Sequence, residues 1–195
     1  MIKLFLSLCY GIFYFFMNGF PNEYNLMEGS VSMKIECIFG HLNRALISLL
    51  SKNPQACSEI RGSKDYKSIS GIVKFYQTAN GTLVYAVVTG LPGETGFHAF
   101  HIHDGESCSG NSDDLFANAK AHYNPSGAAH PDHAGDLPPI LNNDGVALSI
   151  FMTDRFTVEE IIRKTVIIHE RADNFTTQPS GNAGKKIACG EIIAL

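Results

Sequence analysis

The chain has 195 residues, of which 17% are charged, and its formal net charge is −4 with the histidines neutral. This length supports one good-sized domain with an extension, and the scattered Lys and Arg residues exclude a basic nucleic-acid-binding protein. Seven of the eight histidines fall between His98 and His169, while Gly is frequent and Trp is absent. This composition favours a β-rich, loop-rich domain, and the histidine clustering indicates metal chemistry.

Residues 1–20 carry one early lysine followed by an apolar and aromatic run. The pattern is typical of a signal peptide, but no small-residue cleavage site follows it. The run from Leu4 to Met17 is shorter than the roughly 20 residues of a membrane span. Three interpretations stay open: a secretion signal, an anchor that associates the chain with a membrane through residues 1–20 only, or upstream translation before a start at Met27 or Met33. The first two place the protein in the cell envelope or outside the cell, and the third places it in the cytoplasm.

The segment 33–52 has apolar residues at helical spacing, interrupted by Gly40, and predicts an amphipathic helix. Asn53-Pro54 ends this pattern, and a polar stretch leads to Lys67. We therefore divide the chain into an N-terminal extension over 1–66 and a domain over 67–195.

From Ser70 onward the sequence alternates strands and loops. Strands are predicted over 70–77, 83–88, 97–104, 146–152, 165–170 and 187–195, with an Asn80-Gly81 turn after the first. A long loop is predicted over 105–143, and a shorter loop over 171–185. A loop as long as the first is usually functional or disordered in a compact domain. Thr157 and Glu160 have the spacing of a capping box, which indicates a helical turn. Many short antiparallel strands indicate a sandwich or a barrel.

The histidine spacing predicts metal binding. In a strand, alternate residues share a face, so His101 and His103 lie together while His98 faces away. The long loop adds three imidazoles and a carboxylate, from His122, His130, His133 and Asp136. Three nitrogens and one oxygen suit a closed tetrahedral zinc site. His169 ends another strand and is available to complete an imidazole-rich site for a metal such as copper.

Four motifs carry a resemblance to a known family. They are Phe100-His101-Ile102-His103, the loop from His122-Tyr123-Asn124-Pro125 to Gly135-Asp136-Leu137-Pro138, the segment Thr165 to Glu170, and the segment Gly181 to Gly190. Over residues 96–195 the chain resembles the copper/zinc superoxide dismutases, especially their compact bacterial members. The resemblance implies an all-β fold, a Greek-key β-barrel or sandwich of about eight antiparallel strands with long metal-binding loops. The N-terminal helical extension would be added to this fold.

The resemblance also implies a role for individual residues. The copper ligands would be His101, His103, His122 and His169, and the zinc ligands His122, His130, His133 and Asp136. His122 would bridge the metals and carry a proton. Asp173 corresponds to a carboxylate that links a copper ligand to a zinc ligand, and Cys108 and Cys189 correspond to a disulfide. Lys186 stands where the family has an active-site Arg, so it keeps the charge but loses the planar fork.

The implied activity is the dismutation of superoxide to dioxygen and hydrogen peroxide by redox-cycling copper bridged to a structural zinc. Two alternatives have the same fold: a copper-binding or copper-delivery domain with little dismutase activity, and a structural domain that holds zinc alone. The complete copper ligand set and the cation at Lys186 favour the enzyme. The sequence leaves a homodimer open.

Overall fold

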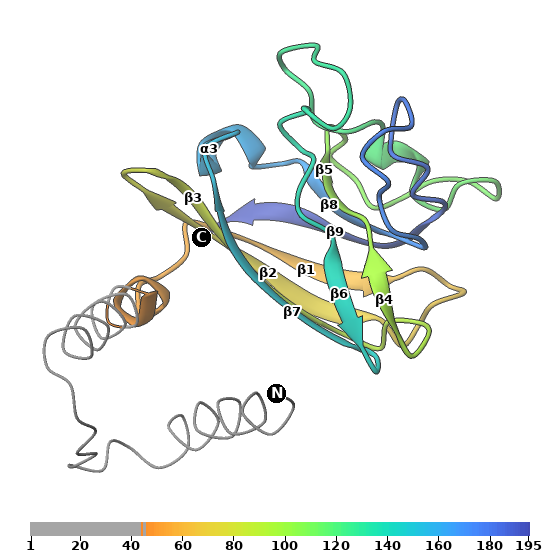
Figure 1. Cartoon of the computed structure of the whole chain (residues 1–195), viewed down its shortest axis with the longest axis horizontal. Helices are drawn as coiled ribbons and strands as arrows, with labels where there is room; N and C mark the ends of the chain where they lie inside the picture. The colour runs from red at the N-terminus through yellow and green to blue at the C-terminus, as the bar shows by residue number, and fades with distance from the viewer. Residues whose placement is uncertain (1–43, 45) are drawn as a thin grey trace, which may run out of the picture. The chain divides into compact units, whose positions relative to one another are not determined.

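The computed structural model describes residue 44 and residues 46–195 (Figure 1). By its internal contacts the chain divides between Leu46 and Ile47, and the second unit contains the barrel. The segment 1–20 and most of the helix predicted over 33–52 lie outside the described residues. Within the predicted helix, residues 44 and 46–50 are described as helical. The rest of the helical extension stays a prediction. Within the described part of the chain, no helix is long and apolar enough to cross a membrane.

Nine antiparallel strands build the described part of the domain (Figure 1). Their bounds are β1 Ala56–Gly62, β2 Ser70–Thr78, β3 Gly81–Thr89, β4 Thr95–His98, β5 Phe100–His103, β6 Ile140–Asn143, β7 Val146–Thr153, β8 Thr165–His169 and β9 Lys186–Ala194. A 3-10 turn, η1 (Ala117–Ala119), and a one-turn helix, α3 (Val158–Ile161), lie between them. The predicted capping box at Thr157 and Glu160 is confirmed.

The strand order is β4-β6-β7-β3-β2-β1-β9-β8-β5. The strands β4 and β5 stand at the two ends of this order, and only Ala99 separates them in the chain. The sheet therefore curves back on itself into a nearly closed barrel. This architecture confirms the predicted all-β antiparallel fold.

The number and limits of the strands differ from the prediction. The barrel has nine strands where about eight were expected, and β1 lies inside the segment 1–66 that the sequence pattern assigns to the extension. Because β1 pairs with both β2 and β9, the barrel begins at Ala56 and not at residue 67. The strand β6 lies inside the predicted long loop and pairs with β4. β6 has only four residues, and β1 places Ser58 among its buried positions, so neither strand shows a clear alternation of apolar and polar residues.

The strand β5 has one face toward the hydrophobic core and the other toward the predicted metal ligands. Phe100 and Ile102 belong to the core cluster, while His101 and His103 have the opposite parity. All four residues are buried, because the loops between β5 and β6 and between β8 and β9 cover the histidine side. These loops lie side by side in Figure 1 and are joined where Gln178 Nε2 donates to the carbonyl of His130 at 2.6 Å.

Candidate metal centre

Strands β5 and β8 supply three of the predicted ligands. His101 and His103 pair opposite Ile167 and Thr165, and His169 ends β8. The rings of His101 and His103 lie 4.1 and 4.9 Å from the ring of His122, measured between centroids. The predicted common face is therefore confirmed.

His98 takes no part in the metal groups found among the described residues. Its Nδ1 lies 2.9 Å from the carbonyl oxygen of His169. Because a carbonyl only accepts, Nδ1 carries the hydrogen and donates it. His98 therefore supports the backbone of a ligand instead of binding a metal.

The long loop returns to β5 and places its ligands there. The amide of Tyr123 donates to the carbonyl of Ile102, and the amide of Ile102 donates to the carbonyl of Gly135. A Cβ at Gly135 would overlap the Ile102 oxygen, so glycine permits this close approach. As a result, His122 lies opposite His103 and Asp136 lies opposite His101 in isolated bridges.

The first group of ligand atoms consists of four buried ring nitrogens without a hydrogen-bond partner in the described part of the chain. They are His101 Nδ1, His103 Nε2, His122 Nε2 and His169 Nε2. Buried polar atoms are almost always paired, so four orphaned nitrogens in one place need an explanation. A metal ion held between them satisfies all four, and a set of imidazoles suits copper.

In three of these rings, the contact of the second nitrogen shows which of the two ring nitrogens carries the hydrogen. His101 Nε2 lies 2.8 Å from Asp173 Oδ2, His103 Nδ1 lies 2.8 Å from the Lys120 oxygen, and His169 Nδ1 lies 3.3 Å from the Gly184 oxygen. Each of these oxygens accepts, so the facing nitrogen is the N–H donor. The lone pair of each ring therefore sits on the unpaired nitrogen that belongs to the metal group.

The second group contains the Nδ1 atoms of three histidines and one carboxylate. Asp136 lies 2.6 Å from His122 Nδ1, 3.0 Å from His130 Nδ1 and 3.1 Å from His133 Nδ1. The contact of His130 Nδ1 lacks hydrogen-bond geometry, which leaves that nitrogen unpaired among the described residues. This donor set fits tetrahedral zinc. His122 contributes one nitrogen to each group, so a single imidazole joins the two metal sites.

The carboxylate of Asp173 connects the two groups from behind. Its Oδ2 accepts from His101 Nε2 at 2.8 Å, and its Oδ1 accepts from His130 Nε2 at 2.9 Å and from the amide of Phe175 at 2.7 Å. Burial opposes its ionisation, but the hydrogen bonds from these donors outweigh burial and hold the pKa of Asp173 well below its ordinary value. The left-handed Gly181 packs against the carboxylate, where a Cβ would overlap Oδ1.

Burial also sets the charge of the copper-group histidines. It lowers the pKa of His103 well below the ordinary value and, together with the neighbouring His101, lowers the pKa of His169 to about 3. Both rings are therefore neutral near pH 7 in the metal-free protein. Neutral rings keep the lone pairs that a metal requires.

The predicted disulfide is present between Cys108 and Cys189, whose Cα atoms are 5.6 Å apart. It ties the loop after β5 to β9, beside the cluster that contains Phe116 and Ile167. Of the described cysteines, Cys57 is unpaired and buried.

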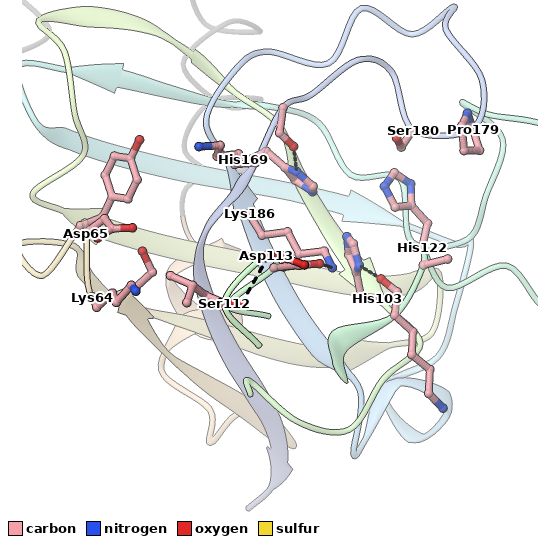
Figure 2. Close-up of a pocket in the computed structure, with 18 of the residues that line it drawn as sticks. Lys64, Asp65, His103, Ser112, Asp113, His122, His169, Pro179, Ser180 and Lys186 are labelled. Atoms are coloured by element: carbon pink, nitrogen blue, oxygen red, sulfur yellow. Dashed lines mark hydrogen bonds and ion pairs between the residues drawn. The ribbon is translucent and has the colours of Figure 1, made fainter. Parts of the chain in front are cut away.

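A cleft of about 600 Å³ opens beside the copper group (Figure 2). Its wall contains four histidines, four lysines and three aspartates: His103, His122, His133, His169, Lys64, Lys120, Lys185, Lys186, Asp65, Asp113 and Asp114. Lys186 Nζ lies 2.7 Å from Asp114 Oδ2 and donates to the carbonyl of Phe116 at 3.1 Å. The partner Asp114 was not expected, because the path of an irregular loop leaves no periodic signal in the sequence.

The barrel carries two ligand groups, one of four histidines and one of three histidines and one aspartate, and His122 belongs to both. This arrangement defines a binuclear metalloprotein. The family described as copper/zinc superoxide dismutase (SODC) matches residues 69–192. Superoxide dismutase (Cu-Zn) 2 of Aquifex aeolicus (strain VF5) is 32% identical over 139 residues, which cover 64% of this chain and 79% of that protein.

Two solved structures have similar folds. The clock protein EA4 matches with a TM-score of 0.61 at 27% identity, covering 74% of this chain and 97% of that chain. The Cu/Zn superoxide dismutase from Brucella abortus matches with a TM-score of 0.61 at 24% identity, covering 70% of this chain and 98% of that chain.

The chain therefore belongs to the copper/zinc superoxide dismutase family. It is an enzyme of that family with both metal sites intact, its cofactors are copper and zinc, and its substrate is superoxide. The predicted family, activity and cofactors are confirmed. The catalytic roles of His122 and Lys186 and the supporting role of Asp173 stay predictions.

Proposed function

We propose that the chain dismutates superoxide in the cleft beside the copper group, and that His122 and Lys186 act on the substrate. The observation that carries the proposal is the convergence of four unpaired imidazole nitrogens next to this cleft. Bound copper would supply one-electron oxidation and reduction there, while zinc would hold the shared ring. Two superoxide ions and two protons yield one dioxygen and one hydrogen peroxide, so the site must attract anions and have access to protons.

His122 has the properties of the proton donor. Its Nδ1 is held 2.6 Å from Asp136 Oδ1 in the zinc group, so the ring keeps its place independently of its other nitrogen. When Nε2 is not bound to a metal, it can hold a proton and donate it to a substrate in the cleft that the ring lines. We assign one of the two protons to this atom and the other to solvent.

Lys186 is proposed to attract the superoxide anion, although its ammonium is already paired with the carboxylate of Asp114. Its side chain is 15% exposed, and the carboxylate of Asp114 cancels part of its charge. The four lysines of the cleft still outnumber the three aspartates. A local positive potential of this kind raises the encounter rate with a small anion.

The experiment compares Lys186→Glu, Lys186→Arg and, as a control outside the cleft, Lys74→Glu. A unit charge about 5–8 Å from a passing anion contributes about 0.5–0.8 kcal/mol in water, so reversing the charge should slow superoxide decay roughly 5–15-fold. The arginine variant should equal or exceed the native rate, and the effect should shrink with added salt. Copper and zinc contents should not change. If Lys186→Glu matches the native rate at low salt, Lys186 does not guide the substrate.

The competing function is a copper-binding or copper-delivery domain with little dismutase activity. Superoxide decay measured on protein with full copper and zinc occupancy separates the two. A domain that only binds or delivers copper would keep both metals and leave superoxide decaying at the uncatalysed rate, and that result would overturn the proposal.

Two further expectations stay proposals. A homodimer is supported by exposed apolar side chains on neighbouring strands, at Phe97, Leu141 and Leu148. Association with a membrane through residues 1–20 rests on their apolar composition alone.

A further inference from the structure

Arg155 lies outside both metal groups and contacts the zinc loop, defined here as residues 130–136. It follows β7 and precedes the buried Phe156. Its Nη1 donates to three carbonyl oxygens, those of Pro131 at 2.9 Å, His133 at 3.1 Å and Asp136 at 3.4 Å. Its Nη2 lies 3.7 Å from Asp132 Oδ1. All hydrogen bonds of this guanidinium to described residues therefore end on the zinc loop.

Two of the three carbonyls belong to zinc ligands themselves. His133 and Asp136 also hold each other, because the amide of His133 donates to Asp136 Oδ2 at 3.1 Å and the amide of Asp136 donates to the His133 oxygen at 3.2 Å. This small closed turn presents the ligand atoms on one side and its carbonyl oxygens to Arg155. The backbone position of two ligands is thus coupled to one side chain from the segment that follows β7.

The other end of the zinc loop is held differently. The amide of His130 donates to Gln178 Oε1 at 3.1 Å, and Gln178 Nε2 donates back to the His130 carbonyl at 2.6 Å. Three of the four copper ligands, His101, His103 and His169, lie on strands whose ladders do not involve Arg155. A change at Arg155 should therefore reach the zinc group first.

We propose that Arg155 is a positioning residue for the zinc site. Its guanidinium gathers the carbonyls of the zinc loop and so fixes the ligand atoms of His133 and Asp136 before the metal arrives. Lysine can replace it only in part: its ammonium offers three N–H donors from one nitrogen, but it lacks the second nitrogen that faces Asp132. The side chain is 40% exposed, so its replacement by the shorter, non-polar leucine leaves no large buried cavity.

The test uses the full-length, metal-free protein with Arg155→Leu and Arg155→Lys. Zinc affinity is measured by competition with a chromophoric chelator, and the visible spectrum of bound cobalt(II) reports how nearly tetrahedral the site is. Arg61→Leu is the matched control, because among the described residues the Arg61 side chain pairs with Glu59 alone, on the exposed face of β1. Copper affinity is measured separately on zinc-free protein.

The leucine variant should bind zinc about 10–100-fold more weakly, as is typical when a group that orients metal ligands is removed. Its cobalt spectrum should change, and the lysine variant should recover part of both losses. Copper affinity should stay within about threefold of native, because three of the four copper ligands lie on β5 and β8, whose ladders do not include Arg155. If both variants keep the native zinc affinity and cobalt spectrum while metal-free and zinc-loaded protein melt lower by the same amount, Arg155 is only a stabilising contact and the proposal fails. If Arg155→Leu does not fold, the same two readouts on Arg155→Lys decide.

Discussion

Replacing Asp173 with asparagine should weaken copper binding more than zinc binding. Two donors converge on Oδ1, His130 Nε2 at 2.9 Å and the amide of Phe175 at 2.7 Å. Oδ2 has one donor in the described part of the chain, His101 Nε2 at 2.8 Å. The amide oxygen of an asparagine is therefore expected to occupy the Oδ1 position. Its NH₂ group then meets the N–H of His101, and two donors oppose each other.

The magnitude follows from the bond that is lost. A hydrogen bond to a charged group contributes about 1.5–3 kcal/mol, so the loss at His101 should lower copper affinity about 10–100-fold. His130 keeps an acceptor that has lost its charge, and a weakening of about 0.5–1 kcal/mol would lower zinc affinity only about 2–5-fold.

The assay is competition with chelators, for each metal separately, on full-length protein. Asp173→Ala removes both acceptors and should weaken both sites, while the exposed Asp154→Asn serves as the control. Zinc affinity falling as much as copper affinity in Asp173→Asn would refute this reasoning. Native affinities for both metals would remove Asp173 from the support of the site.

The remaining predictions concern the ligands, the barrel limits and pH. His169→Ala removes an unpaired nitrogen of the copper group and none of the zinc group, so elemental analysis should show lost copper and near-native zinc; equal loss of both metals would contradict the two-site assignment. A chain starting at Asn53 should fold and bind both metals, whereas one starting at Lys67 lacks β1 and should show no cooperative thermal unfolding; a native melting temperature for the shorter chain would be the contrary result. Burial lowers the pKa of His103 and His169 in the folded metal-free protein, so the unfolded state binds more protons below the unfolded pKa of about 6.5. The free energy of unfolding should therefore be highest above that pH and fall by up to about 1.4 kcal/mol per pH unit for each proton toward acid; urea titrations showing a stability independent of pH from about 7 to about 5 would contradict this.

The sequence by itself determined the ligand types and their pairing on β5. His101 and His103 are two residues apart, and strand alternation is a local property that survives in any fold that keeps the strand. The donor set of the loop, three imidazoles and one carboxylate, likewise indicated zinc without any coordinates. The disulfide and the role of each ligand came from the resemblance to a family, because spacing alone leaves the pairing open.

The tertiary structure alone decided which nitrogen of each ring is available to a metal. The choice for His103 depends on the carbonyl of Lys120 and the choice for His169 on the carbonyl of Gly184, both supplied by loops. The same holds for the strand β1, which closes the barrel between β2 and β9, and for the pairing of Lys186 with Asp114. These contacts join residues far apart in the chain, and local periodicity carries no information about them, because it reports only which face of a strand or helix is buried.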